Sequence, residues 1–345
     1  MVTCEDRPVS ERPETTPTGS SAAQDRRLLI AFVGVLVVVF ALVGSNVAAN
    51  HAPKPHHVPV GIIGTPPVVG AVAGSVERRA PGAYQIHAYS SLAAAQTAIL
   101  HRVIYGAFRP DPSPLLLVAS AASPAVATLL QQTVAANVHT QGEALVVRDL
   151  VPLPSSDSRG ATAFSMVLSL IITAIMGSAV IYLLGQHRPP PQRLAAMVAL
   201  GIAAGLVASL VTNILIGAFP GHFLAVWGVA TLFYLALGMP IGAFQVLVGA
   251  GGVGIGAVMF LVIGNPASGG SSAPELLPGF WREVSQLLPP GAATTAMRDV
   301  VYFHGHGMGY ALLVLGLWAV LGATFVVTVH ILRARARVAI RTTGP

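Results

Sequence analysis

The sequence predicts a mainly α-helical membrane protein with six transmembrane helices. It also predicts a small extracytoplasmic α/β domain between helices 1 and 2, and a re-entrant or interfacial helical pair before helix 6. The first observation is composition: the 345 residues are 54% hydrophobic and 9% charged, with a mean hydropathy of +0.71, whereas soluble domains carry about 25% charged residues. The second is the recurrence of long apolar stretches. The third is an alternation of β-like and helical patterns after the first of them.

Six stretches reach the roughly 20 apolar residues that a membrane-spanning helix needs. They are residues 28–49, 161–184, 194–219, 222–240, 242–263 and 310–332. The first ends in NVAAN, which is typical of a signal-peptide cleavage site, but its apolar core exceeds the roughly 7–15 residues of such peptides. We therefore expect a retained anchor, preceded by a disordered cytoplasmic tail at residues 1–27.

The basic residues beside these spans predict the orientation of the chain, because cytoplasmic loops carry an excess of Lys and Arg. Six spans and two cytoplasmic termini place all three basic groups on the inner face of a cell membrane, and residues 334–345 form a basic cytoplasmic tail. The inside-facing basic anchors are Arg26 and Arg27 before the first span, Arg188 and Arg193 in the second loop, and Arg333, Arg335 and Arg337 after the last.

The region between the first two spans, residues 50–160, is predicted to be the α/β domain. It opens with HAPKPHH, a Pro-stiffened stalk, and β-like runs then alternate with helical stretches. Ser90 or Ser91 is expected to cap one helix, Pro124 to begin another, and residues 115–118 to form the central strand. The Tyr105-Gly106 pair is interpreted as a packed strand feature.

The sequence offers little support for an enzyme, and no catalytic, cofactor-binding or metal-ligating residue is predicted. Ser120 and Ser123 border a strand–helix turn without a nucleophile elbow, so helix capping is the simpler interpretation. The stalk histidines suggest metal capture as an alternative, but no carboxylate or cysteine accompanies them. His304 and His306 of the HGHG connector, with Asp299 nearby and His222 on the same membrane face, are a second metal-binding alternative. A glycine-rich connector with interfacial histidines is the simpler interpretation. No basic run is interleaved with aromatic residues, which argues against nucleic-acid binding.

Residues 194–274 contain no Asp, Glu, Lys or Arg. Ionisable groups inside a membrane are typical of proton relays, so their absence argues against a proton-driven carrier. Asn46, Asn213, Gln245 and His222 are the remaining polar candidates, with interhelical hydrogen bonding as the simpler interpretation. The glycine-rich fifth span contains Gly249, Gly252 and Gly256, which indicate either close helix packing or a flexible, cavity-lining helix.

The segment 264–307 interrupts the apolar C-terminal half with prolines and charges. In ELLPGFWREVSQLLP, apolar residues recur at helical spacing with an aromatic pair, which predicts an amphipathic helix at a membrane interface. A second short helix, AATTAMRDVVYF, follows before the last span. Two interfacial or re-entrant helices are therefore expected as a hairpin at residues 265–309, within a five-helix membrane domain at residues 161–333.

The motifs NPASGG and ELLPGFWREVSQLLPPGAATTAMRDVVYF, together with VPVGIIGTPP, Tyr105-Gly106-Ala107 and LLLVASAASP, resemble the type-2 ATP-binding-cassette exporter permeases. The closest likeness is to the phage-infection-protein branch, over about residues 28–333. In that fold, paired outer helices line an extracellular gate. The resemblance therefore implies an outer gate that contains Leu277, Pro278, Gly279, Phe280, Trp281, Leu288, Pro289, Pro290 and Arg298.

The resemblance also implies a function and its partners. The chain would be an exporter-like permease subunit in a bacterial plasma membrane, and it would move an apolar or amphiphilic molecule. It would contact membrane lipids, form a homodimer or heterodimer, and depend on a separate ATPase subunit for energy. The alternative is a non-transporting envelope protein that presents the outer domain as a binding or assembly platform. The short, proline-broken QHRPPPQR loop, where such permeases carry a coupling helix, favours this alternative.

Overall fold

The computed structural model describes residues 18–139, 144–270 and 272–342. By residue contacts the chain divides into two units, residues 1–44 and 45–345. The first helix, α1 (Thr18–Asn50), supplies the described part of the first unit. The predicted disordered tail is therefore wrong for residues 18–27, where good helix formers such as Ala, Gln and Arg continue the apolar helix. Residues 1–17 of that tail lie outside the described residues.

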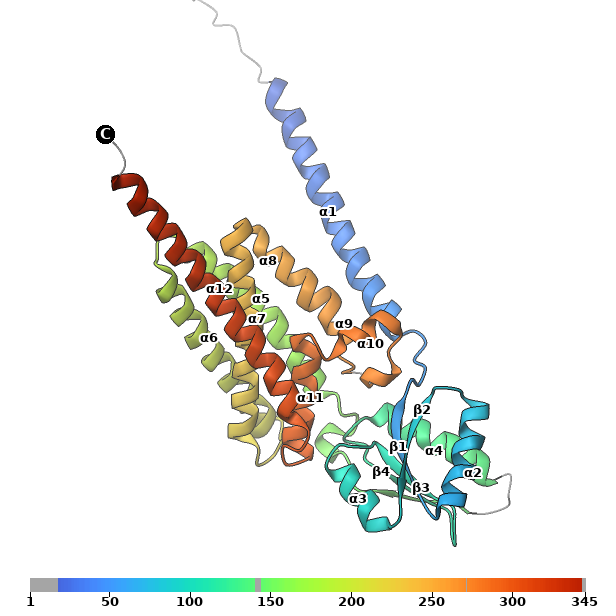
Figure 1. The fold of residues 1–345 in the computed structure, drawn as a ribbon. Coiled ribbons are helices and arrows are strands. Elements are labelled where there is room, and N and C mark those ends of the chain that lie inside the picture. The colour runs from blue at the N-terminus through green and yellow to red at the C-terminus, as the bar shows by residue number, and fades with distance from the viewer. Residues whose placement is uncertain (1–17, 140–143, 271, 343–345) are drawn as a thin grey trace, which may run out of the picture. The chain divides into compact units, whose positions relative to one another are not determined.

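The sheet domain contains five strands in the order β2-β1-β3-β4-β5 (Figure 1). They are β1 (Val58–Ile63), β2 (Tyr84–Tyr89), β3 (Gly106–Arg109), β4 (Leu115–Val118) and β5 (Val146–Asp149). β1 pairs in parallel with β2 and β3, β4 pairs in parallel with β5, and β3 and β4 are antiparallel. The prediction that residues 115–118 form the central strand is wrong. β3 is central, and β4 is the most buried strand without being the middle one.

Three helices cover the two faces of this sheet. α2 (Pro66–Arg79) and α4 (Pro124–His139) lie on one face, and α3 (Leu92–Leu100) lies on the other. Ser91 caps α3, because its hydroxyl accepts a hydrogen bond from the Ala94 N–H at 3.2 Å, and Pro124 begins α4, as predicted. Both cores are completed by the segment 264–307: Ala273 and Leu276 pack under α4, and Phe303 packs under α3.

The short helix η1 (Ser155–Asp157) leads from the sheet domain into the apolar helices. These are α5 (Thr162–Leu184), α6 (Pro190–Leu210) with the π-helical η2 (Val211–Leu215), α7 (Phe223–Val248) and α12 (Met308–Thr342). Within the described residues, five helices are long and apolar enough to cross a membrane: α1, α5, α6 with η2, α7 and α12. The chain is thus a multi-pass membrane protein. α7 is the most buried of the five and packs against α5, α6 and α12.

The stretch predicted as span five differs from the other five. It forms a 17-residue apolar helical run built from α8 (Gly251–Gly256), the π-helical η3 (Ala257–Gly264) and α9 (Asn265–Ala267). The predicted break near residue 241 is wrong, because α7 continues through Pro240 and ends at a turn containing Gly249. Gly249 has φ 65°, ψ −139°, a conformation that suits only glycine.

The segment 264–307 contains η4 (Pro274–Leu276), α10 (Gly279–Ser285) and α11 (Pro289–Tyr302). α10 is shorter than the predicted amphipathic helix. Most residues of α11 are buried, and it packs against α5, α7 and α12. Six of its 14 residues are alanine, glycine or threonine, and these small side chains permit close approach of neighbouring helices. α12 continues to Thr342, so the described part of the predicted basic tail is helical.

Candidate functional site

A polar chamber of about 230 Å³ lies where the sheet domain meets the segment 264–307. The sheet domain contributes residues from β1 and from the loop between α3 and β3. The other wall comes from α9 to α11 and the connector before α12. The chamber is lined by Pro59, Arg102, Ile104, Tyr105, Ser268, Pro274, Glu275, Gln286, Thr295, Arg298, Asp299 and Gly307. Its charged residues are Arg102, Glu275, Arg298 and Asp299, whereas residues 194–274 contain none.

A buried ion pair joins the two walls. Arg102 Nε donates to Asp299 Oδ1 at 2.8 Å, and the side chains are 14% and 1% exposed. The Arg102 guanidinium also lies 5.6 Å from the centre of the Tyr105 ring and 4.9 Å from that of Phe303. Arg102 has φ 65°, an uncommon conformation for a residue with a side chain. The packing of the chamber thus holds Arg102 in place from several sides.

The Asp299 carboxylate is buried, and only one of its two oxygens has a hydrogen-bond partner. Its Oδ2 is buried without a hydrogen-bond partner, and burial raises the pKa of Asp299 to about 6, against the lowering influence of Arg102 and Arg298. Desolvation disfavours the charged form of an acid, and here it outweighs two nearby cations. The Arg102–Asp299 pair is therefore sensitive to protonation in the range of mildly acidic pH.

A second polar bond crosses the chamber. The Tyr105 hydroxyl donates to Glu275 Oε2 at 2.9 Å. Burial, followed by the nearby Glu275 carboxylate, raises the pKa of Tyr105 well above its usual range, so this phenol remains a donor. Further links lie close by: Ser123 Oγ donates to Ser272 O at 2.9 Å, and the His56 N–H donates to Glu275 O at 2.9 Å. The sheet domain is thus bonded to the segment 264–307 rather than merely tethered to it.

Arg298 faces the chamber from α11 and is 6% exposed. Its Nη2 donates to Gly270 O at 2.8 Å, and neither ion pair among the described residues includes it. Burial, followed by the repulsion of Arg102, lowers its pKa, although a guanidinium stays charged in proteins. The chamber therefore contains a buried cation whose hydrogen-bonding capacity is mostly unused by the protein.

Of the residues predicted to form the outer gate, Arg298 alone lines this chamber. Leu277, Pro289 and Pro290 are buried in the protein, whereas Gly279 and Phe280 are exposed, and Pro278, Trp281 and Leu288 are intermediate. Phe280 and Trp281 pack edge to face, with ring centres 5.4 Å apart. The structure therefore divides the predicted gate between a buried part and an aromatic pair in which Phe280 is exposed and Trp281 is half-buried.

A larger groove runs along the membrane-spanning helices. It has a volume of about 720 Å³ and is lined by α5, α6, η2 and Tyr234 of α7. α5 contributes a row of hydroxyls at helical spacing, from Thr162, Ser165, Ser169 and Thr173. Ser169 Oγ donates to Ser165 O and Thr173 Oγ1 to Ser169 O, both at 2.9 Å. These hydroxyls are satisfied within their own helix, so the groove suits an apolar occupant.

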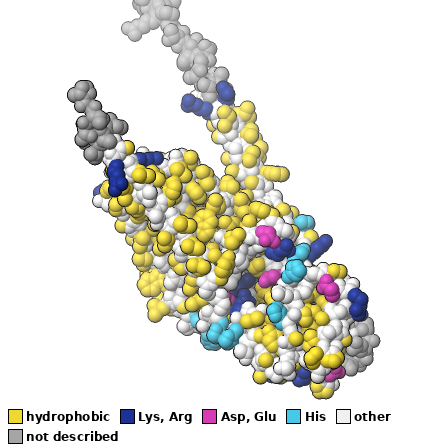
Figure 2. Space-filling model, in the orientation of Figure 1, with side chains coloured by type: hydrophobic (Ala, Val, Ile, Leu, Met, Phe, Trp, Pro, Cys, Tyr) yellow, Lys and Arg dark blue, Asp and Glu magenta, His cyan; other side chains and the backbone are white. Residues whose placement is uncertain are grey.

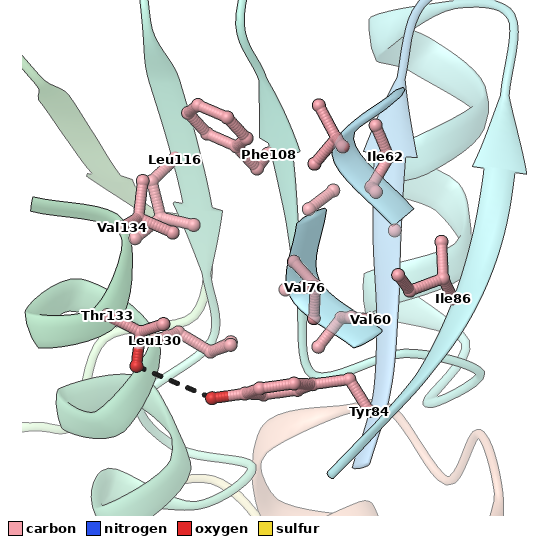
Figure 3. Close-up of a pocket in the computed structure, with 14 residues that line it drawn as sticks. Val60, Ile62, Val76, Tyr84, Ile86, Phe108, Leu116, Leu130, Thr133 and Val134 are labelled. Atoms are coloured by element: carbon pink, nitrogen blue, oxygen red, sulfur yellow. Dashed lines mark hydrogen bonds between the residues drawn. The ribbon is translucent and has the colours of Figure 1, made fainter. Parts of the chain in front are cut away.

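The sheet domain contains a third cavity, of about 70 Å³ (Figure 3). Figure 3 shows aliphatic side chains of β1, β2 and α4 converging on it, with Phe108 and Leu116 behind them. The Tyr84 hydroxyl lies 3.4 Å from Thr133 Oγ1 at its edge. With no charged residue in its wall, this cavity offers packing space and little chemistry.

The remaining predicted residues have mostly structural contacts. A side chain on Gly252 would collide with the backbone of Phe244 and Gln245, and one on Gly256 with Ile241, so both positions support the close-packing interpretation. Gly249 lies in the turn before α8 rather than in the span. Gln245 Nε2 donates to Ser178 O across two helices at 3.0 Å, as the interhelical interpretation requires.

The described basic anchors of the second unit gather at one end of the helices. Arg193 lies 5.5 Å from the centre of the Tyr182 ring, and Arg333 Nη2 donates to Val246 O at 3.1 Å. Residues 193 and 246 line one small cavity, which places both contacts at the same end. Figure 2 shows dark blue side chains at that end and a yellow apolar surface along the helices. The Arg337 side chain lies outside the described residues.

Sequence reasoning missed the chamber itself. Tyr105 was interpreted as a packing residue, and Asp299 was considered only beside the connector histidines as a metal ligand. Among the described residues, no group of three or more His, Cys, Asp or Glu side chains is placed to bind a metal ion. Instead, His306 stacks on His101 with ring centres 4.1 Å apart. An available signal was the return of charged residues in the segment 264–307, among them Glu275, Arg298 and Asp299, after 81 residues without any.

The fold and the chamber define a multi-pass membrane protein with a sheet domain bonded to the segment 264–307. The family described as "Protein of unknown function (DUF3533)" matches residues 82–324. This match covers more than half of the chain, and the chain therefore belongs to that family. It includes every charged residue of the chamber. Comparison with curated proteins and with solved structures gives no match.

Proposed function

We propose that the chain is an exporter-like permease subunit that moves an apolar or amphiphilic molecule across a bacterial plasma membrane. The groove along α5 and α6 carries this proposal, because about 720 Å³ of apolar space opens between membrane-spanning helices. Ligand pockets in proteins range over about 300–1,000 Å³ and are mostly apolar. A lipid-like chain is the occupant whose chemistry fits such a wall.

Two π-helical segments support a change in the packing of the membrane helices during transport. η3 is an eight-residue π-helix in the short run after α7, and π-helical turns are rare and frequent at functional sites. The π-helical η2 lies at the end of the groove. We propose that these irregular turns let the helices around the groove change their packing during transport, while the sheet domain and α11 form the gate on the outer side.

The orientation and partners belong to the same proposal. Basic residues at the end of the helices remote from the sheet domain favour a cytoplasmic location for that end. Both termini would then be cytoplasmic, and a second permease subunit together with a separate ATPase would complete the transporter. The hydrogen bonds between the sheet domain and the segment 264–307 argue against the platform alternative, since a presented domain needs no such links to the membrane helices.

Groove-filling variants test this proposal in cells that normally contain the chain, where any partner subunits are present. Ala203 lines the groove and is exposed, and Ile202 beside it is 43% exposed without lining the groove. We expect Ala203→Phe to lower export of a fluorescent short-chain phospholipid at least tenfold, and Ile202→Phe to leave export unchanged. Export that survives deletion of the gene would refute transport, and full complementation by Ala203→Phe would favour the platform alternative.

A further inference from the structure

We propose that the polar chamber is a binding site for an oxyanion, a phosphate or carboxylate group, and that Arg298 is its principal ligand. The inference deepens the proposed function, on which it rests, by assigning an acidic head group to the exported amphiphile. The groove alone does not distinguish acidic amphiphiles from neutral ones.

The first step is the unused capacity of Arg298. A guanidinium has five N–H donors, and the structure gives Arg298 one hydrogen bond, to Gly270 O. The residue is nevertheless 6% exposed, and it lines the chamber. A buried charge without a partner is strongly unfavourable, so an anion that enters would relieve a cost already present in the fold.

The second step is that the other cation is occupied. Arg102 is held by Asp299 at 2.8 Å and by two aromatic rings. An incoming anion would therefore meet Arg298 first. Thr295 and Gln286 both line the chamber. Thr295 Oγ1 donates to Gln286 Oε1 at 2.9 Å, and Gln286 Nε2 donates to Ser285 Oγ at 3.2 Å. The two bonds fix the amide, and its second N–H can serve as a neutral donor to an anion.

The third step is size and charge. The chamber volume of about 230 Å³ is several times the roughly 30 Å³ that one water molecule occupies in the liquid, so a head group has room. Glu275 and Asp299 oppose an anion, and their presence predicts a modest affinity that removal of either charge would raise. Glu275 is the cleaner choice, because Asp299 also holds Arg102.

Binding to the purified full-length chain in detergent tests the site without any transport step. The probes are inorganic phosphate, dihexanoyl phosphatidate and dihexanoyl phosphatidylcholine, measured by titration calorimetry at pH 7.5. We expect phosphatidate to bind wild type at least tenfold more tightly than Arg298→Gln, with Arg298→Lys intermediate and Glu275→Gln severalfold tighter than wild type. Arg282→Gln is the matched control, since Arg282 lies on α10 and outside the chamber lining.

Thr295→Val keeps the assay decisive if Arg298→Gln fails to fold. It removes the hydroxyl that fixes the Gln286 amide and changes no charge, and we expect severalfold weaker phosphatidate binding. Equal binding of phosphatidate and phosphatidylcholine, or equal affinities in wild type, Thr295→Val and Arg298→Lys, would overturn the proposal. Inorganic phosphate that binds as tightly as phosphatidate would support the site and assign it to a water-soluble anion. Failure of these measurements leaves the Ala203→Phe export result intact, so the two proposals can fail separately.

Discussion

The polar chamber and the membrane groove are both cavities of this protein, but the chamber is lined by charged side chains and the groove is not. The chamber contains two arginines and two acids, and its bonds link residues 197 and 170 positions apart. The groove has no charged residue. The Ser169 and Thr173 hydroxyls donate to carbonyls of their own helix, and the Tyr234 hydroxyl of α7 donates to Thr173 O of α5 at 3.0 Å. The comparison shows that Arg102, Glu275, Arg298 and Asp299 face a space enclosed by protein, whereas the groove between the apolar helices has no charged residue in its wall.

The largest expected effect on the unfolding free energy comes from removing one charge from the chamber. Asp299→Ala leaves Arg102 buried without its carboxylate, and loss of one partner of a buried pair costs about 3–5 kcal/mol. Glu283→Ala is the comparison, because it removes the acid of the Arg282–Glu283 pair. The two charged atoms of this pair are 3.4 Å apart, and the Glu283 side chain is 74% exposed. A surface pair of this kind contributes about 0–1 kcal/mol to the unfolding free energy. Chemical unfolding in detergent, followed by circular dichroism, measures both. Equal losses would mean that the chamber pair is not sealed from water.

The second prediction uses pH on the same carboxylate. Burial raises the pKa of Asp299 to about 6, whereas an unfolded Asp titrates near about 3.9. The folded state then binds more protons than the unfolded state between these values. The unfolding free energy should therefore fall as pH rises from about 4 to 6, by roughly 2–3 kcal/mol at about 1.4 kcal/mol per pKa unit.

Asp299→Asn provides the control for this pH dependence, because it keeps the shape and cannot ionise. Thermal unfolding of wild type and Asp299→Asn from pH 4 to pH 7 isolates the contribution of Asp299 from that of other groups. A difference with the opposite slope, in which the wild type gains stability as pH rises, would show that Arg102 and Arg298 outweigh burial at this site.

Local patterns predicted much of this molecule. Hydropathy located the long apolar helices, and the alternation between them located the strands, because both depend on neighbouring residues. Pattern reasoning failed where distant contacts decide. The sequence around Pro240 resembles a helix break, yet α7 continues through it and turns at Gly249. α11 resembles an interfacial helix, yet its small residues allow it to be buried.

The chamber could not be predicted for the same reason. Arg102, Tyr105 and Glu275 are ordinary polar residues in their own neighbourhoods, and they become a site only when the sheet domain folds against the segment 264–307. Arg298 was included in the predicted gate because the type-2 permease resemblance places the gate in that segment. Its burial without a paired charge is a property of the tertiary structure, and nothing in the local sequence signals it.

A third prediction concerns the apolar helices. There the close packing of glycines, and not a charged pair, is the feature that a substitution can test. A Cβ on Gly252 would collide with the backbone of Gln245 and Phe244, whereas one on Gly254 meets nothing within 4 Å. Gly252→Ala should cost about 1–3 kcal/mol through overpacking. Gly254→Ala, in the same helix, should stabilise by roughly 0.5–1 kcal/mol through helix propensity. Thermal unfolding distinguishes them, and two stabilising results would favour a flexible span over close packing.

The smallest expected effect concerns the second bond across the chamber. Tyr105→Phe keeps the ring beside Arg102 and removes the hydroxyl that donates to Glu275 Oε2. A buried acceptor left without its donor costs about 1–3 kcal/mol. The loss should lie near the lower end, because Glu275 is only partly buried and the chamber can supply water. Denaturant unfolding of Tyr105→Phe, Glu275→Ala and the double variant completes a double-mutant cycle, because alanine at position 275 leaves no acceptor for the hydroxyl. A coupling energy near zero would show that Tyr105 and Glu275 act independently, and that the Arg102–Asp299 pair alone joins the charged walls of the chamber.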